Sequence, residues 1–435
     1  MIKVAKFGGS SLSDASQFVK VKKIILSDTS RALIVVSAPG KSLTHDNKIT
    51  DLLYLLHAHL KYGVDHEVLF EMIESRFKTI QKELGLKYDI ASDFSKLKKE
   101  LNKNISLDYL VSRGEYFTAI LLSEYLGYQF VDASQVLKFS YNSHVDLIET
   151  EKCFKKALEE NKKIVVPGFY GSYPNQSIHL LSRGGSDLTG SIAARAVGAT
   201  LYENWTDVSG FLMADPKIVQ YPKKIHEITY HELRELSYMG ANVLHEDSII
   251  PLQDLDIPIN ILNTNAPDEE GTLIKNTCDD DSQIITGIAG KKNFTVFTIT
   301  KTNTAKKLKV LQDVLKLFEK YNVGIEHLPS SIDTFSVIVE AEQVEKVYFD
   351  LVGSITQVED VTNIEVEKDM ALISVVGRNM STRPGIAGKL FGHLGANNIN
   401  INMIAQSSQE INIVVGVKNS DFERTIQSIY EAFVI

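Results

Sequence analysis

The chain opens with residues 2–11, Ile2-Lys3-Val4-Ala5-Lys6-Phe7-Gly8-Gly9-Ser10-Ser11, in which a short apolar segment runs into paired glycines. The apolar part predicts a β-strand, and residues 15–26 carry apolar side chains at helical spacing. Residues 31–37 form a second apolar, β-branched segment, which is typical of a buried strand. This order of strand, helix and strand predicts a parallel sheet.

The alternation of strand and helix patterns continues along the first two-thirds of the chain. Strands are expected at 130–133, 163–169 and 200–205, and helices at 49–60, 152–160 and 187–197. Parallel strands joined by helices imply an α/β sheet covered on both faces. Residues 64–104 interrupt this order with two helical patterns, the second at 96–103. We expect an all-helical insertion with a structural role; a lid or a contact surface is the alternative.

The last third of the chain contains an internal repeat behind a polar linker at residues 278–282. One copy covers residues 317–331 and the other runs from Leu390 to Ser407. Each copy reads as a helix ending in Leu-Phe, a turn, an alternating strand and small polar residues. A second strand is expected after each copy, at 335–339 and 411–415. Duplicated units of about 70 residues indicate paired small modules rather than a solenoid.

Charge and composition exclude several classes of protein. The chain has 46 basic and 55 acidic residues, a balance that argues against broad nucleic-acid binding. Its apolar runs are strand-sized, so neither a membrane helix nor a signal peptide is expected. The cysteines, Cys153 and Cys278, form no CxxC pair, which suits a reducing cytoplasm.

Two glycine-rich segments are candidates for an anion site. In the first, Lys6 precedes Gly8 and Gly9 ahead of a helix, so backbone N–H groups and a cation could meet a phosphate. The second, residues 182–190, joins Arg183 to another glycine pair at a helix start. The alternative is a plain Gly-Gly turn for the first segment and a Ser or Asp helix cap for the second. Together the two loops suit an oligophosphate and a transferred phosphoryl group.

Two further polar segments follow the same rhythm. Residues 205–217 form a loop after a strand, for which a turn built by Asp, Gly and Pro is the alternative. Residues 110–115 begin a helix, where Glu115 either complements the helix dipole in its first turn or holds a substrate ammonium. Walker A, GxGxxG, GxSxG and HExxH motifs are absent, and the histidines show no ligand spacing, so no metal site is expected.

Taken in order, these segments resemble the aspartokinases of the amino-acid kinase family over nearly the whole chain. The resemblance implies a three-layer αβα catalytic domain at 1–280 with the insertion at 64–104. Two ferredoxin-like ACT domains would follow, at 294–369 and at 281–293 plus 370–435. The residues that carry the resemblance are 6–11, 35–38, 112–115, 168–171, 182–187, 205–208 and 214–216, with 377–380 and 383–387 at the start of an ACT domain.

The implied reaction is phosphorylation of L-aspartate by ATP with Mg²⁺ to give 4-phospho-L-aspartate, the first step of lysine, threonine and methionine biosynthesis. The nucleophile would be the substrate's own carboxylate, which is ionised near neutral pH, so no general base is needed. We expect a monofunctional enzyme, because no dehydrogenase segment follows Ile435. The cysteine pattern favours a cytoplasmic one.

The resemblance also assigns residues to roles. Lys6 and Asp187 are the expected catalytic pair. Nucleotide contacts are expected from Lys6, Gly8, Gly9, Ser10, Thr206, Asp207, Leu212 and Lys217, and aspartate contacts from Ser37, Thr50, Glu115, Phe169, Arg183 and Ser186. Arg183 would grip the α-carboxylate and Glu115 would meet the ammonium. Leu212 stands where relatives often carry Tyr. Asn242 stands where many relatives carry a lysine, and the absence of that lysine leaves open how the charge on the ATP phosphates is offset.

Regulation is expected at the first ACT domain, through Gly324, Glu326, Ser330, Ser331 and Asp333. The effector would be L-lysine, with L-threonine as the alternative. The alternative interpretation of this stretch is that these are ordinary turn residues. ACT pairing implies a homodimer or a dimer of dimers. Two rival functions remain: a glutamate-type kinase of the same fold, and an inactive amino-acid sensor. No nucleic-acid or membrane partner is expected.

Overall fold

The computed structural model describes residues 1–434 except 43, 183, 241–243, 245, 279–283, 302–306, 379, 381–382 and 407–410. The chain divides into two compact units. The first consists of Met1–Phe211, Lys224–Leu233 and Asn242–Cys278, and the second of Leu212–Lys223, Arg234–Ala241 and Asp279–Ile435. Two short segments, 212–223 and 234–241, therefore belong with the C-terminal region although the chain around them belongs to the first unit.

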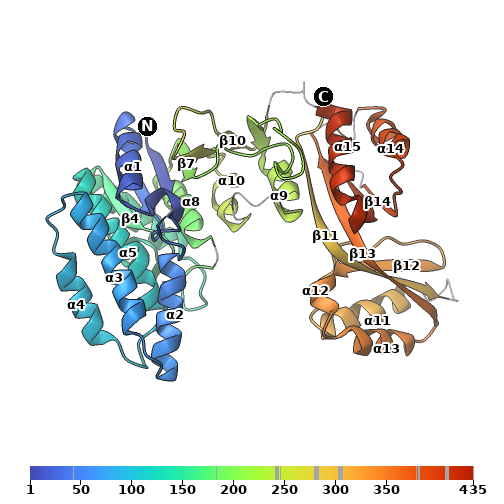
Figure 1. Ribbon diagram of the computed structural model, residues 1–435, viewed down its shortest axis with the longest axis horizontal. Helices are drawn as coiled ribbons and strands as arrows, with labels where there is room; N and C mark the ends of the chain where they lie inside the picture. The colour runs from blue at the N-terminus through green and yellow to red at the C-terminus, as the bar shows by residue number, and fades with distance from the viewer. Residues whose placement is uncertain are drawn as a thin grey trace. The chain divides into compact units, whose positions relative to one another are not determined.

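The first unit is built on an eight-stranded sheet with the order β3-β4-β2-β1-β7-β9-β10-β8. Figure 1 labels β4, β7 and β10 of this sheet. β1 lies between β2 and β7 and is parallel to both, and the β9–β10 pair is antiparallel. The mostly parallel α/β sheet expected from the sequence is confirmed. Its strands are β1 Lys3–Phe7, β2 Arg31–Val36, β3 Gln129–Phe130, β4 Ile164–Pro167, β7 Leu201–Thr206, β8 Glu227–Thr229, β9 Ile259–Asn263 and β10 Thr272–Lys275, and β5 Tyr170–Ser172 with β6 Ile178–Leu180 forms a separate hairpin.

Strand alternation divides the side chains of β1 between two faces. Ala5 and Phe7 join the apolar core with α1, α2 and α5, whereas α8 lies against β1, β2 and β7 and packs on α7. Lys6 is therefore turned away from the larger core. The helices of this unit are η1 Gly9–Leu12, α1 Ala15–Ser27, α2 Ile49–Tyr62, α3 Glu67–Glu83, α4 Ile90–Glu100, α5 Leu107–Leu126, α6 Ala133–Val136, α7 Leu147–Asn161, α8 Gly185–Val197, η2 Glu246–Ser248 and α10 Ile250–Gln253; α9 Tyr230–Tyr238 crosses from the first unit into the second.

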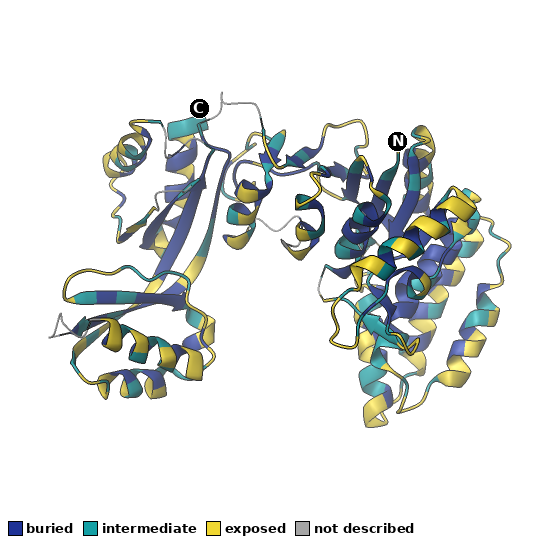
Figure 2. Cartoon of the chain, turned by 180° about the vertical axis from the view of Figure 1, so that it is seen from behind, coloured by how far each residue is buried: buried dark blue, intermediate teal, exposed yellow. Residues whose placement is uncertain are grey.

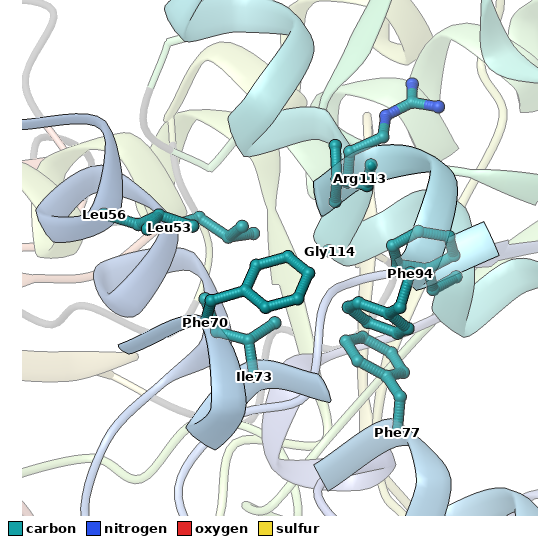
Figure 3. A pocket seen from close by; sticks show the side chains of 10 residues that line it. Leu53, Leu56, Phe70, Ile73, Phe77, Phe94, Arg113 and Gly114 are labelled. Atoms are coloured by element: carbon teal, nitrogen blue, oxygen red, sulfur yellow. The ribbon is translucent and has the colours of Figure 1, made fainter. Parts of the chain in front are cut away.

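The interruption at residues 64–104 is helical, as expected, but its second helix begins earlier than the sequence pattern suggested. α4 starts at Ile90, where the Asp89 side chain caps it, and it ends at Glu100. Phe70, Phe77 and Phe94 of α3 and α4 pack with Phe117 of α5. Figure 3 shows this cluster beside Gly114; the space between its side chains is too small for a water molecule. The insertion is thus fused to the main core.

The second unit contains a five-stranded sheet with the order β12-β11-β13-β15-β14, antiparallel throughout. The long strands β11 and β13 pair along much of their length. Met370–Val376 of β13 is buried, whereas most of residues 361–369 are exposed, and α11 and α13 expose their outer faces (Figure 2). The elements are β11 Gly287–Lys301, β12 Thr334–Glu340, β13 Val361–Val376, β14 Met403–Ala405, β15 Asn412–Lys418, α11 Lys307–Lys320, α12 Ala341–Val344, α13 Tyr348–Thr356, α14 Ile386–Ala396, η4 Asn419–Asp421 and α15 Phe422–Val434.

The repeat differs from expectation in one place. The expected second strands are present as β12 and β15. The prediction of an alternating strand within 317–331 is wrong. That stretch makes only isolated bridges, His327 to Ile338 and Ser330 to Phe335. Pro329 lacks an N–H donor and contributes only its carbonyl, which accepts from Ser336. Within the described part of the chain, no helix has the length and apolar character needed to cross a bilayer.

Candidate functional site

Lys6 lies at the centre of a buried polar cluster on the α8 side of the sheet. Its Nζ is 2.5 Å from Oδ1 of Asp187, in the first turn of α8, and 3.4 Å from Oδ1 of Asn204. The Asn204 amide donates to the same Asp187 oxygen at 2.9 Å. β1 and β7 are in register with Lys6 opposite Asn204, so strand pairing places the amide beside the ammonium. The structure therefore brings the two expected catalytic residues together.

The loop after Lys6 packs closely against neighbouring backbone segments. The Gly8 N–H donates to the Trp205 carbonyl at 2.9 Å, and the Gly40 N–H donates to the Gly9 carbonyl at 2.7 Å. A Cβ on Gly9 would lie 2.8 Å from the Ala38 oxygen, so only glycine fits there. Gly9 begins the short helix η1, and α1 starts only at Ala15. The Asp14 side chain caps α1, which leaves the η1 amides, including that of Ser10, as the candidates for an anion.

Glu115 is not a first-turn residue. α5 begins at Leu107, capped by the Ser106 side chain, so the expectation of a helix-dipole role at the start of the helix is wrong. The carboxylate is buried and Oε1 accepts from the Ala38 N–H at 3.1 Å. Its Oε2 atom is buried with no hydrogen-bond partner among the described residues. Burial raises the pKa of Glu115 to about 8, although the hydrogen bond from Ala38 acts to lower it. The carboxyl of the free protein is therefore mostly protonated at neutral pH.

The start of α8 and the turn after β4 approach each other closely. Phe169 has a positive φ of 76°, unusual for a residue with a side chain, and its N–H donates to the Thr189 hydroxyl at 3.0 Å. A Cβ on Gly168 would lie 2.8 Å from the Ser186 side chain, which brings Ser186 against this turn. Gly184, at φ 75°, is the N-cap residue of α8, and no side chain caps it. The Ser or Asp cap offered as the alternative for this segment is thus wrong.

The remaining expected aspartate residues are placed by the ends of the central strands. Ser37 follows β2 directly, and its N–H donates to the Phe7 carbonyl at 3.1 Å. Thr50 is half-buried in the first turn of α2. The C-terminal ends of β1, β2, β4 and β7 share one edge of the sheet because the strands are parallel. Arg183, Asn242, residues 279–282, Asn379 and Ser407 lie outside the described residues.

The expected nucleotide residues fall in both units. Thr206 ends β7 in the first unit, and its hydroxyl donates to the exposed Asp207 carboxylate at 3.1 Å. Leu212 and Lys217 belong to the second unit, where both are exposed. The Lys217 N–H donates to Asp215 at 2.9 Å, which makes a tight Asx turn. Leu212 and the neighbouring Pro216, Gln220, Tyr221 and Pro222 line an open hollow of about 570 Å³.

The expected effector residues lie on the surface of the second unit. Ser330, Ser331 and Asp333 are exposed. The Gly324 N–H donates to the Gln343 side chain at 2.6 Å. The Glu326 carboxylate accepts from the Tyr238 hydroxyl, and burial together with this contact raises the pKa of Tyr238.

Asn204 is the residue of this cluster that the sequence did not reveal. It is one of several polar residues in β7, and its partners lie far away in sequence. The Tyr202 hydroxyl, on the same face, donates to the Asp187 carbonyl at 3.1 Å. Polar residues two apart near the end of a buried strand were the available signal.

Comparisons with known proteins match this architecture over the whole chain. The family model of the amino acid kinase family matches residues 1–263, and an ACT domain model matches residues 373–433. Aspartokinase 3 of Bacillus subtilis is 34% identical over 99% of this chain and 98% of its own length. The crystal structure of Clostridium acetobutylicum aspartate kinase is similar with a TM-score of 0.93, at 46% identity, covering 99% of both chains.

Two solved structures of a more distant relative contain ligands. E. coli aspartokinase III in complex with aspartate and ADP has a TM-score of 0.78 at 25% identity, and the complex with lysine and aspartate has 0.80 at 25%. Each covers 100% of both chains. With a full-length curated relative and a matching kinase model, the chain belongs to the amino acid kinase family, and within it to the aspartokinases.

Proposed function

We propose that this aspartate kinase transfers the γ-phosphoryl group of MgATP to the side-chain carboxylate of L-aspartate, giving 4-phospho-L-aspartate and ADP. The observation that carries the proposal is the buried cluster of Lys6, Asp187 and Asn204 beside the Gly8-Gly9 turn. The aspartate and ADP bound by E. coli aspartokinase III support it. We also propose a cytoplasmic location, which cysteines without a CxxC pair suit.

In the proposed step, a carboxylate oxygen of aspartate attacks the γ-phosphorus while the bond to the ADP oxygen breaks. The attacking oxygen is already ionised, so the protein aligns the reactants and offsets charge. Lys6 is held by Asp187 and Asn204, so its ammonium has a fixed position before the substrates bind. The amides around Gly8, Gly9 and Ser10 receive phosphate oxygens, and Mg²⁺ enters as part of the nucleotide substrate.

Aspartate is proposed to bind along the edge formed by Ser37, Thr50, Phe169 and Ser186. Its ammonium pairs with Glu115, whose buried Oε2 has no hydrogen-bond partner in the part of the site that the structure describes. An ammonium there would stabilise the ionised carboxylate and lower the pKa of Glu115. Arg183 is proposed, from its sequence position, to hold the α-carboxylate. Glu115 thereby selects an amino acid over a simple dicarboxylate.

Nucleotide contacts are proposed at Thr206, Asp207, Leu212 and Lys217. Lys217 offers a cation on an ordered Asx turn, which is one way to offset phosphate charge where Asn242 replaces a lysine. We also propose a catalytic domain at residues 1–280, with ACT domains at 294–369 and at 281–293 plus 370–435. The pairing of β11 with β13 on both sides of a register shift at Lys291–Phe294 supports the intertwined division of the last two.

Feedback inhibition is proposed to act through the first ACT domain, with L-lysine as the effector. Lysine is bound by E. coli aspartokinase III in one of the related structures. Here Glu326 offers a carboxylate to an ε-ammonium, and Gly324, Ser330, Ser331 and Asp333 lie on the same exposed stretch. L-Threonine is the alternative effector. ACT domains pair between chains, so a homodimer or a dimer of dimers is proposed.

An acyl-phosphate trap tests the proposal directly. Purified protein with MgATP, L-aspartate and hydroxylamine should form aspartyl hydroxamate, and L-glutamate in place of aspartate should not. Lys6→Ala should abolish product while the circular dichroism spectrum stays native. Added L-lysine should lower the yield more than L-threonine does. Folded protein that binds lysine but forms no hydroxamate would instead identify an amino-acid sensor.

A further inference from the structure

Arg76 is a buried cation that no role assigned above requires. It lies on α3 of the helical insertion, and only 3% of the residue is exposed. All four of its hydrogen bonds to described residues go to backbone carbonyl oxygens. Nε and Nη2 donate to Ser13 at 3.3 and 3.0 Å, Nη1 donates to Asn47 at 2.9 Å, and Nη2 also donates to Gly40.

The three acceptors belong to the two loops that carry the site. Ser13 ends the loop that begins at Gly8, and Gly40 and Asn47 lie in the loop between β2 and α2, which begins at Ser37. These loops also touch each other, because the Gly40 N–H donates to the Gly9 carbonyl. One guanidinium on α3 thus joins the proposed phosphate loop to the proposed aspartate loop.

Chemistry explains why this position holds an arginine. A guanidinium presents five N–H donors in one plane, whereas an ammonium is a compact point charge with three. Burial lowers the pKa of Arg76, while the charge of Asp14 works in the opposite direction. Desolvating a cation is costly, and here its partners are carbonyl dipoles of loops rather than a carboxylate. Packing alone would be served at lower cost by an apolar side chain, as at the neighbouring Ile73 and Phe77.

We infer that Arg76 is a positioning residue for phosphoryl transfer, which fixes the loop at Gly8–Ser13 relative to the loop at Ser37–Asn47. The inference rests on the proposed function, since it is the roles of those loops that give their spacing a consequence. It also gives the helical insertion a part in catalysis, because Arg76 extends from α3 to both loops.

The test compares Arg76→Lys and Arg76→Met with a matched core variant, Phe94→Leu. Phe94 packs in the same insertion, against Phe70 and Phe77, and its side chain has no N–H group to donate to a loop carbonyl. We expect both Arg76 variants to lose kcat by tenfold or more, on the order of a hundredfold for Arg76→Met, because small misplacements of reacting groups are costly. Phe94→Leu should lower Tm while its kcat and both KM values stay near wild type.

Two further results separate positioning from stability. Arg76→Ala should recover part of its kcat when guanidinium is added at concentrations below those that unfold the protein. The same addition should not activate Phe94→Leu. Folded Arg76→Lys with wild-type kcat, and KM values also unchanged, would overturn the inference. That result would leave the Lys6→Ala outcome untouched, so the inference and the proposed function fail separately.

Discussion

Asn204 connects both members of the proposed catalytic pair, and its removal should reveal how much their positioning contributes. Asn204→Ala deletes the 2.9 Å bond to Asp187 and the 3.4 Å contact with Lys6. We expect kcat to fall by about tenfold to a hundredfold with small changes in KM, because a misplaced ammonium mainly affects the transition state. Steady-state kinetics of ADP release measures this. Tyr202→Phe is the control, since it removes a bond to the Asp187 carbonyl and leaves the carboxylate alone; an equal loss in both variants would contradict the assignment.

Glu115 predicts a pH dependence of aspartate binding. Its pKa in the free enzyme is raised to about 8, so below this pH the carboxyl is mostly protonated and must lose a proton to pair with an ammonium. We expect kcat/KM for aspartate to rise with pH up to about 8 and then level off on the enzyme side. Glu115→Gln should lose this rise and about 2 kcal/mol or more of kcat/KM. A rise that persists in the glutamine variant would assign the titration to another group.

The raised pKa of Glu115 also predicts how the stability of the protein depends on pH. Stability should fall as the pH rises, whereas kcat/KM for aspartate should increase. Because the folded-state pKa is raised above the ordinary value, the folded protein holds the proton more tightly than the unfolded chain. The free energy of unfolding from this group is therefore highest at low pH and falls as pH increases from about 4.5 to about 8. Urea unfolding across this range should show a steeper decline for wild type than for Glu115→Gln. Parallel declines would mean that Glu115 is ionised in the folded protein.

At the scale of elements, the space around a glycine predicts the effect of adding a methyl group there. A Cβ on Gly40 would lie 2.6 Å from the Gly9 carbonyl carbon and 2.8 Å from the Ser10 nitrogen. Gly40→Ala should therefore cost about 1–3 kcal/mol and reduce activity, since the two site loops must separate. Gly353→Ala, in the interior of α13 with open space around the new methyl, should stabilise by about 0.5–1 kcal/mol. Calorimetry should show Tm falling in Gly40→Ala and rising in Gly353→Ala, and steady-state kinetics should show a loss of activity in the first variant alone.

Elements with a local signal were predictable from the sequence. β2 contains a continuous apolar run that ends in three β-branched residues, so it could be expected where it occurs. α8 was also predictable from its paired glycines, although it begins at Gly185, two residues before the predicted start. The stretch at 317–331 alternates like a strand, but its pairing with β12 is limited to two bridges. Strand pairing depends on the partner, which a local pattern does not contain. The roles of Asn204 and Arg76 could not be predicted for the same reason, because both depend on contacts with residues distant along the chain.

At the scale of the whole molecule, the path of the chain ties proposed nucleotide residues to the regulatory region. Residues 212–223, which carry Leu212 and Lys217, belong to the second unit. The Lys223 N–H donates to the Tyr430 hydroxyl at 2.8 Å, and the Gln427 amide donates to the Ile218 carbonyl at 2.8 Å. Tyr430 and Gln427 lie on α15, the C-terminal helix of that unit. A movement of α15 would therefore be felt by the segment that carries Lys217.

This connection predicts a selective kinetic effect of Tyr430→Phe. The variant loses one hydrogen bond, worth about 0.5–1.5 kcal/mol, and leaves the ring in its buried position. If the segment binds nucleotide, KM for ATP should rise by about two- to tenfold, while KM for aspartate and the Tm change little. Gln427→Ala should act in the same direction, and Arg424→Ala, on the same helix with bonds to Asp421 and the Asn397 carbonyl, should not. Equal changes in the KM values for ATP and aspartate would show that α15 acts on the fold rather than on the nucleotide segment.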